Sequence, residues 1–193
     1  MKACWVIGMV IASGVHAEEC SVNVYLVTGV LVPAGMLGDA EKKATQMFRE
    51  IGVKLRTRDG IPSHDLSNGC GAPIVVQVED AAGYRGHSDA LAYAAPYRES
   101  GTCIHVFLDR VVHLSSERGF ANILLAHVMA HEIAHVLEGI KRHSDEGVMK
   151  AAWTRDDYQR MERHPLSFAA EDVRLIGEGI AKRQRAGDFS PAP

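Results

Sequence analysis

Two histidines inside a long apolar segment constrain the fold more than any other feature of this chain. Residues 120–137 are almost entirely apolar and have the length of a buried helix, and His131 and His135 lie within them. Because four residues are slightly more than one helical turn, both imidazoles project from the same face. They can therefore bind one metal ion, and Glu132 stands where a carboxylate could accept a proton from water at that ion.

The residues that follow supply a third ligand. Gly139 can adopt the left-handed conformation that ends a helix and turns the chain. His143 follows within reach of the first two histidines. Three protein ligands leave a fourth position open, as in catalytic rather than structural zinc sites. We therefore predict one catalytic Zn²⁺ ion, bound by His131, His135 and His143, with Glu132 as the general base.

Several neighbouring residues are alternatives for these roles. If His143 is not a ligand, a carboxylate would replace it, from Asp145, Glu146 or the distant Glu171. His127 lies one turn before His131, but three ligands on one helix would strain tetrahedral geometry, so we interpret it as a core or supporting residue.

At this point the chain resembles a known clan. His131, Glu132, His135, Gly139, His143 and Met149 resemble the motif of the metzincins, which are zinc endopeptidases with a methionine-containing turn beneath the metal. His143-Ser144 followed by Gly147-Val148-Met149 is closest to the matrixin style, although each interval of the motif is one residue longer than usual. The resemblance covers roughly residues 21–150 and implies that Met149 packs beneath the metal.

A second resemblance concerns the segment from Leu91 to Pro96, which is similar to the matrixin edge strand above the cleft. It implies that an extended substrate pairs as an added antiparallel strand along Leu91, Ala92, Tyr93 and Ala94. Tyr93 stands where matrixins have a histidine that binds a structural zinc, so we carry no structural zinc over to this chain.

The order of elements predicts an α+β fold of the zincin or metzincin type. Its parts are a mixed twisted sheet of about five strands with an edge strand over the cleft, a long active-site helix, a methionine turn and C-terminal helices. Strands are predicted at 21–28, 53–58, 74–78, 90–97 and 104–108. Helices are predicted at 38–51, at 120–137 after a cap at Ser115 or Ser116, at 155–161 after Thr154, and at 168–183 after Ser167.

The first residues indicate export. Lys2, a short apolar run and Val15-His16-Ala17 are typical of a secretory signal peptide spanning residues 1–17. We predict one catalytic domain at 18–185, a flexible tail at 186–193, and a secreted or periplasmic protein without a membrane span. A net charge of -3 and the absence of a long basic run argue against nucleic acid as a partner. We expect the short basic pair Lys141-Arg142 on a solvated loop, and a monomeric protein.

Three cysteines remain after removal of residues 1–17. Each precedes an apolar run that is predicted to be a strand, and the starting ends of parallel neighbours lie close together. We therefore favour a disulfide between Cys70 and Cys103, with Cys20–Cys70 as the second choice.

These observations favour a secreted zinc-dependent endopeptidase that acts on a peptide or protein substrate. Only a few residues separate Ala17 from the first predicted strand, so an inhibitory pro-segment is not expected there. A non-catalytic secreted domain that uses metal for stability is one alternative, and a zinc amidase acting on cell-wall peptide is another. Glu132 argues against the first of these, because a structural metal site needs no base.

Overall fold

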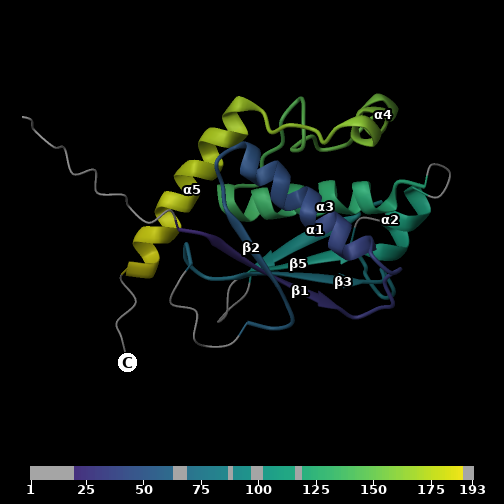
Figure 1. Cartoon of the computed structure of the whole chain (residues 1–193), viewed down its shortest axis with the longest axis horizontal. Coiled ribbons are helices and arrows are strands. Elements are labelled where there is room, and N and C mark those ends of the chain that lie inside the picture. The colour runs from purple at the N-terminus through teal and green to yellow at the C-terminus, as the bar shows by residue number, and fades with distance from the viewer. Residues whose placement is uncertain (1–19, 63–68, 87–88, 97–101, 116–118, 189–193) are drawn as a thin grey trace, which may run out of the picture.

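A five-stranded sheet forms one layer of the molecule. The computed structural model describes residues 20–62, 69–86, 89–96, 102–115 and 119–188 (Figure 1). The strands are β1 (Val22–Thr28), β2 (Leu55–Asp59), β3 (Ile74–Glu79), β4 (Ala92–Pro96) and β5 (Thr102–Phe107). They are arranged in the order β2-β1-β3-β5-β4, with β4 antiparallel to β5 and the other neighbours parallel. The predicted mixed sheet with an edge strand is confirmed.

Five helices lie within the described residues. They are α1 (Met36–Glu50), α2 (Leu108–Ser115), α3 (Ala121–Glu138), α4 (Arg155–Arg163) and α5 (Ala170–Asp188). Figure 1 shows α1 and α3 side by side over one face of the sheet, with α5 crossing the end of the layer. The α+β fold of the zincin type that the sequence predicts is therefore present.

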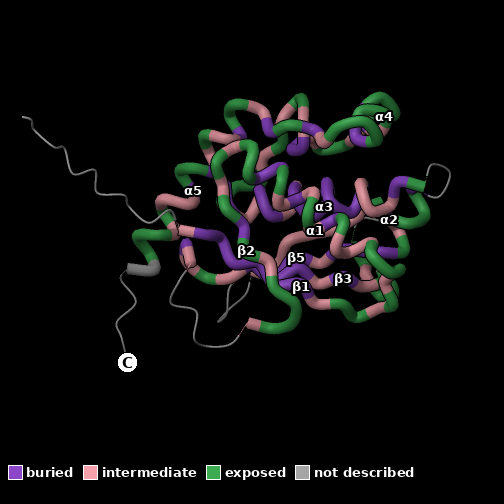
Figure 2. Tube along the Cα trace, in the orientation of Figure 1, coloured by how far each residue is buried: buried purple, intermediate pink, exposed green. Residues whose placement is uncertain are grey.

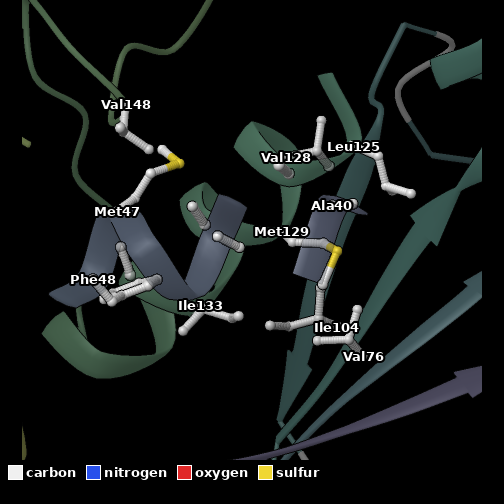
Figure 3. Packing of buried hydrophobic residues seen from close by; sticks show 14 of the residues in the cluster. Ala40, Met47, Phe48, Val76, Ile104, Leu125, Val128, Met129, Ile133 and Val148 are labelled. Atoms are coloured by element: carbon white, nitrogen blue, oxygen red, sulfur yellow. The ribbon is translucent and has the colours of Figure 1, made fainter. Parts of the chain in front are cut away.

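The main core fills the space between the sheet and α3, which is buried on nearly every side (Figure 2). Met129 and Ile133 of α3 point toward Val76 and Ile104 of the sheet and toward Phe48 of α1 (Figure 3). All five side chains are at most 1% exposed. Each large apolar side chain buried in this way contributes about 1.5–3 kcal/mol. The helix that carries the two histidines is therefore held rigidly.

The helix α2 was not predicted from the sequence. Residues 108–115 directly follow β5, and a short apolar run after a strand does not distinguish a helix from further strand. The buried residues Leu108, Val111 and Ser115 recur at helical spacing. The predicted cap for the long helix is also wrong at Ser115, whose hydroxyl donates to the carbonyls of Val111 and Val112 within α2; Ser116 lies outside the described residues.

The C-terminal helices differ in their agreement with the sequence. Thr154 caps α4 as predicted, and its hydroxyl and backbone exchange hydrogen bonds with Asp157. The cap at Ser167 is wrong, because α5 begins at Ala170 and Asp172 accepts the Ala169 backbone N–H instead, at 2.9 Å. The helix also continues to Asp188, five residues beyond its predicted end at 183.

The favoured disulfide is wrong, and the second choice is the one present. Cys20 and Cys70 form the bond, and their Cα atoms are 5.3 Å apart. The Cys70 backbone N–H donates to the carbonyl of Ser21 at 2.9 Å, which brings Cys70 beside the start of β1. Cys103 is instead a buried thiol inside β5 that takes no part in the disulfide; it lies opposite Val75 and on the other face of the sheet from the main core.

Two predictions at the N-terminus fall outside the described residues, namely the signal peptide at 1–17 and its cleavage near Ala17. Within the part of the chain that the structure describes, each helix is too short or too polar to cross a bilayer.

Candidate metal centre and cleft

Three imidazoles converge at the C-terminal end of α3. The Nε2 atom of His135 lies 3.0 Å from Nε2 of His131 and 3.3 Å from Nε2 of His143. The ligand atoms of all three residues lie within 4.8 Å of one another. Tetrahedral zinc with Zn–N bonds of about 2.0–2.1 Å requires nitrogens roughly 3.3 Å apart. The donor set and its spacing therefore fit zinc.

Hydrogen bonding assigns the nitrogen that faces the centre. Nδ1 of His131 donates to the carbonyl of Val148 at 2.9 Å. In the neutral ring, Nε2 then carries the free lone pair. A hydrogen bond to the second nitrogen of this kind fixes the tautomer and ring orientation of metal-binding histidines. Three such nitrogens pointing at one spot repel one another unless a cation lies between them.

Two glycines shape the loop that brings His143 back to α3. Gly139 ends the helix in the left-handed conformation at φ 70°, as predicted, and its N–H donates to the carbonyl of His135 at 3.0 Å. Gly147 has φ 74°, and a Cβ atom there would overlap the carbonyl oxygen of Ser167. The positive φ favours glycine at both positions, and at Gly147 there is also no room for a side chain.

Val148 and Met149 follow Gly147 and are both fully buried. The carbonyl of Met149 accepts the N–H of Ser144 at 2.8 Å, and the N–H of Val148 donates to Ser167 at 3.0 Å. This segment, which also accepts the hydrogen bond of His131 at Val148, is thus bound both to the loop that carries His143 and to the residues that precede α5.

Burial favours the neutral form of His131 and His135. It lowers the pKa of His131 and, together with the neighbouring His131 and His143 rings, lowers the pKa of His135 to about 4. Neutral imidazole is the form that binds metals.

A cavity of about 500 Å³ adjoins the cluster, and His131, His143 and Glu132 line it. Burial raises the pKa of Glu132 to about 7, and a cation nearby would lower it. The remaining wall is mostly apolar and includes Leu114, Trp153 and Tyr158. No motif in the sequence singles out Trp153 or Tyr158, because the chain returns to the cavity only through α4 and the segment before it.

The edge strand lies along this cavity, although only part of the predicted contact set faces it. Leu91, Ala92 and Ala94 all pack against the main core, and Leu91 and Ala92 also line the cavity. Tyr93 points to the other face of the sheet, where its ring stacks on His105 at 4.7 Å between centroids. Because the side chains of a strand alternate between faces, Ala92 and Ala94 share the face of the main core and Tyr93 lies on the opposite face. The outer backbone edge of β4 has no neighbouring strand in the described sheet.

The alternative ligands lie elsewhere. Asp145 and Glu146 are exposed and are not part of the metal-competent group, while Glu171 forms an ion pair with Arg174 at 2.6 Å. His127 is buried, donates from Nδ1 to the carbonyl of Ile123 at 2.8 Å, and accepts the Leu166 N–H at Nε2 at 3.0 Å. Both nitrogens of His127 are therefore engaged in holding the core.

The fold that these elements build is that of the zincins and metzincins. Among solved structures, archaemetzincin from Methanopyrus kandleri has a similar fold, with a TM-score of 0.56 and 16% sequence identity. The similarity covers 85% of this chain and 98% of the archaemetzincin chain. No family model matches the sequence, and no curated protein is significantly similar to it. The likeness therefore establishes the fold, and function has to be argued from the site.

Proposed function

We propose that this protein is a zinc-dependent endopeptidase. The observation that carries the proposal is the convergence of three imidazole nitrogens, with Glu132, in a cleft beside a free sheet edge. A non-catalytic metal site would need neither the cleft nor the carboxylate. The matrixin-like spacing around His143 and Met149 is part of the same proposal.

In this proposal His131, His135 and His143 hold the ion and Glu132 moves the proton. Zinc bound there would polarise the scissile carbonyl and lower the pKa of water toward neutrality. Glu132 takes a proton from the attacking water and then delivers it to the leaving amine nitrogen. Its position next to His131 on a rigid helix keeps the carboxylate at a constant distance from the reacting atoms.

The substrate binds in an extended conformation along β4. Its backbone pairs with the free edge of the strand, and one of its side chains enters the largely apolar cavity beside Leu91 and Ala92. Because Tyr93 faces away from the cavity, it acts on the substrate through its backbone alone.

The first test separates metal binding from catalysis. We expect Glu132→Gln to retain zinc at one equivalent and to lose peptide hydrolysis by at least 10²–10⁴-fold, which is the usual contribution of a general base. Zinc content is measured by elemental analysis and hydrolysis on casein and a peptide library, with and without a chelator. Undiminished turnover in this variant would remove Glu132 from the mechanism.

The second test concerns the third ligand. We expect His143→Ala to lose most of its zinc affinity, whereas His113→Ala, on α2 and outside the ligand cluster, should leave it unchanged. Unchanged zinc content in His143→Ala would contradict the proposed ligand set. Hydrolysis of cell-wall peptide but not of casein would instead identify an amidase.

We further propose that the protein is exported, with cleavage near Ala17, and acts as a monomer. The Cys20–Cys70 disulfide supports an oxidising compartment. N-terminal sequencing of protein recovered from the periplasm or medium should begin at Glu18, and light scattering should give the mass of one chain. An intact N-terminus in the cytoplasm would contradict export.

A further inference from the structure

We propose that Asp172 of α5 is a positioning residue that holds His143 in place for the metal. This inference rests on the ligand set proposed above and concerns a residue that touches none of the three imidazoles within hydrogen-bond distance. His131 and His135 are fixed by α3, whereas His143 belongs to a loop and needs another support.

The two residues that flank His143 are bound to a single carboxylate. Arg142 donates from Nη1 to Oδ1 of Asp172 at 2.7 Å, and the Ser144 hydroxyl donates to the same oxygen at 2.5 Å. Nη2 of Arg142 also contacts the Ser144 hydroxyl oxygen at 3.0 Å, which closes a ring of three side chains. The chain on either side of His143 is thus attached to one point.

The Asp172 carboxylate is itself held in place. Asp172 is fully buried, and its second oxygen accepts the Ala169 N–H at 2.9 Å at the start of α5. On the other side, the Ser144 N–H is bound to Met149. The loop therefore connects the first turn of α5 to the buried segment beneath the histidines, with His143 between the two anchors.

Removing this carboxylate has a predictable effect on the loop. Loss of Asp172 leaves the half-buried Arg142 and the Ser144 hydroxyl without their shared partner. Because an unsatisfied buried polar group is unfavourable, both groups should form hydrogen bonds with solvent instead. The loop then moves toward solvent and carries His143 away from the other two ligands. Residues that orient metal ligands typically contribute about 10–100-fold to metal affinity.

The experiment measures zinc affinity by competition with a chromophoric chelator, so its main readout does not depend on activity. We expect Asp172→Ala to weaken zinc binding by about 10–100-fold and Asp172→Asn, which keeps one acceptor oxygen, to weaken it less. The matched control is Glu171→Gln, the neighbouring carboxylate on the same helix, whose ion pair with Arg174 is half-exposed. This control should bind zinc as the wild type does.

A second carboxyl near Arg142 has to be controlled. Glu138 is buried, and its pKa is raised to about 7 by burial and then by the charge of Asp172, while Arg142 acts in the opposite direction. Without Asp172, Arg142 could pair with Glu138 and partly restore the loop. Asp172→Ala is therefore also measured with Glu138→Gln, and the double variant should bind zinc no more tightly than Asp172→Ala.

A spectroscopic readout distinguishes positioning from general destabilisation. With Co²⁺ in place of zinc, the visible absorption of Asp172→Ala should change toward that of His143→Ala, because both lose the same ligand. If Asp172→Ala does not fold, Ser144→Ala and Arg142→Lys serve instead, and each should show a smaller shift in the same direction.

The outcomes are distinguishable. A wild-type affinity and spectrum in these variants would overturn the role of Asp172 while leaving the ligand set intact. A wild-type protein that binds no zinc would overturn both proposals. A protein that binds zinc with the expected dependence on Asp172 but hydrolyses no peptide would overturn only the proposed endopeptidase activity.

Discussion

Three histidines of one helix show how surroundings decide the role of a residue. His127, His131 and His135 follow one another at four-residue intervals on α3. Both nitrogens of His127 are occupied by the backbone of Ile123 and Leu166, whereas Nε2 of the other two faces the centre. The sequence predicted this division because a tetrahedral ion does not accept three ligands from one helix. The partner at Nε2, Leu166, lies 39 residues further along the chain, and no pattern in the sequence pairs it with His127.

His127 should make stability depend on pH. Burial lowers its pKa to about 4, against about 6.5 in the unfolded chain. The unfolded state therefore binds the proton more readily, so the contribution of His127 is present above pH 6.5 and is lost as the pH falls toward 4. The loss approaches roughly 3 kcal/mol at the lower limit.

Urea unfolding of the wild type and of His127→Gln between pH 7.5 and 4 checks this prediction. The slope of unfolding free energy against pH should be smaller in the variant, and zinc release is common to both proteins and cancels in the difference. Equal slopes would show that His127 titrates normally in the folded protein.

Arg142 is the residue that the sequence placed worst. A basic pair between two glycines is typical of a solvated loop, and Lys141 is indeed exposed. Arg142 instead binds the buried Asp172, which follows it by 30 positions. A pairing over such a separation leaves no periodic trace in one sequence, and a charged residue on α5 is expected to face water.

At the scale of elements, regular apolar spacing and capping residues were the most informative signals. The helix that carries the motif, the strands and the capping box at Thr154 follow from apolar spacing and local hydrogen bonding. The unpredicted α2 and the early end assigned to α5 are failures at segments without a distinct boundary signal. The close approach of α5 to α3 depends on Gly179, which the sequence alone does not distinguish from Gly177.

Gly179 allows α5 to lie directly against the end of α3. A Cβ atom at Gly179 would overlap the carbonyl oxygen of Leu137, while one at Gly177, two residues earlier on the same helix, would meet nothing within 4 Å. We expect Gly179→Ala to lower the unfolding free energy by about 1–3 kcal/mol. Gly177→Ala is the matched control and should raise it by up to about 1 kcal/mol, through helix propensity.

Thermal or urea unfolding of both variants measures the difference. Equal effects of the two substitutions would show that the helices do not approach as closely as described. Because α5 also carries Asp172, Gly179→Ala should weaken zinc binding as well.

At the scale of the whole molecule, the architecture was predictable while the covalent link was not. The sheet, its edge strand and the helical layer follow from the order of apolar segments and from a motif that fixes one helix. The disulfide was misassigned because Cys103 lies within β5 rather than before it, and strand boundaries are the least certain part of such reasoning.

The disulfide should contribute strongly to stability. Cys20 and Cys70 are separated by 50 residues, and closing a loop of that length stabilises the folded state by roughly 4 kcal/mol in the chain-entropy model. Replacing both cysteines by serine should lower the unfolding free energy by a similar amount. Cys103→Ser should have a smaller effect, because Cys103 makes no cross-link.

Alkylation of the denatured, unreduced protein followed by peptide mass analysis provides an independent check. In protein without residues 1–17, only Cys103 should be labelled, and reduction should expose Cys20 and Cys70. Labelling of Cys20 under unreduced conditions would contradict the pairing.

The dependence of His143 on a residue of the last helix has a consequence for biosynthesis. His131 and His135 leave the ribosome well before Asp172 does. In the proposed arrangement, the growing chain therefore lacks the support of His143 until α5 has emerged. On the proposed ligand set, a nascent chain that ends before Asp172 should bind zinc about 10–100-fold more weakly than the completed protein. The order of residues along the chain thus delays tight metal binding until the last described helix has been synthesised.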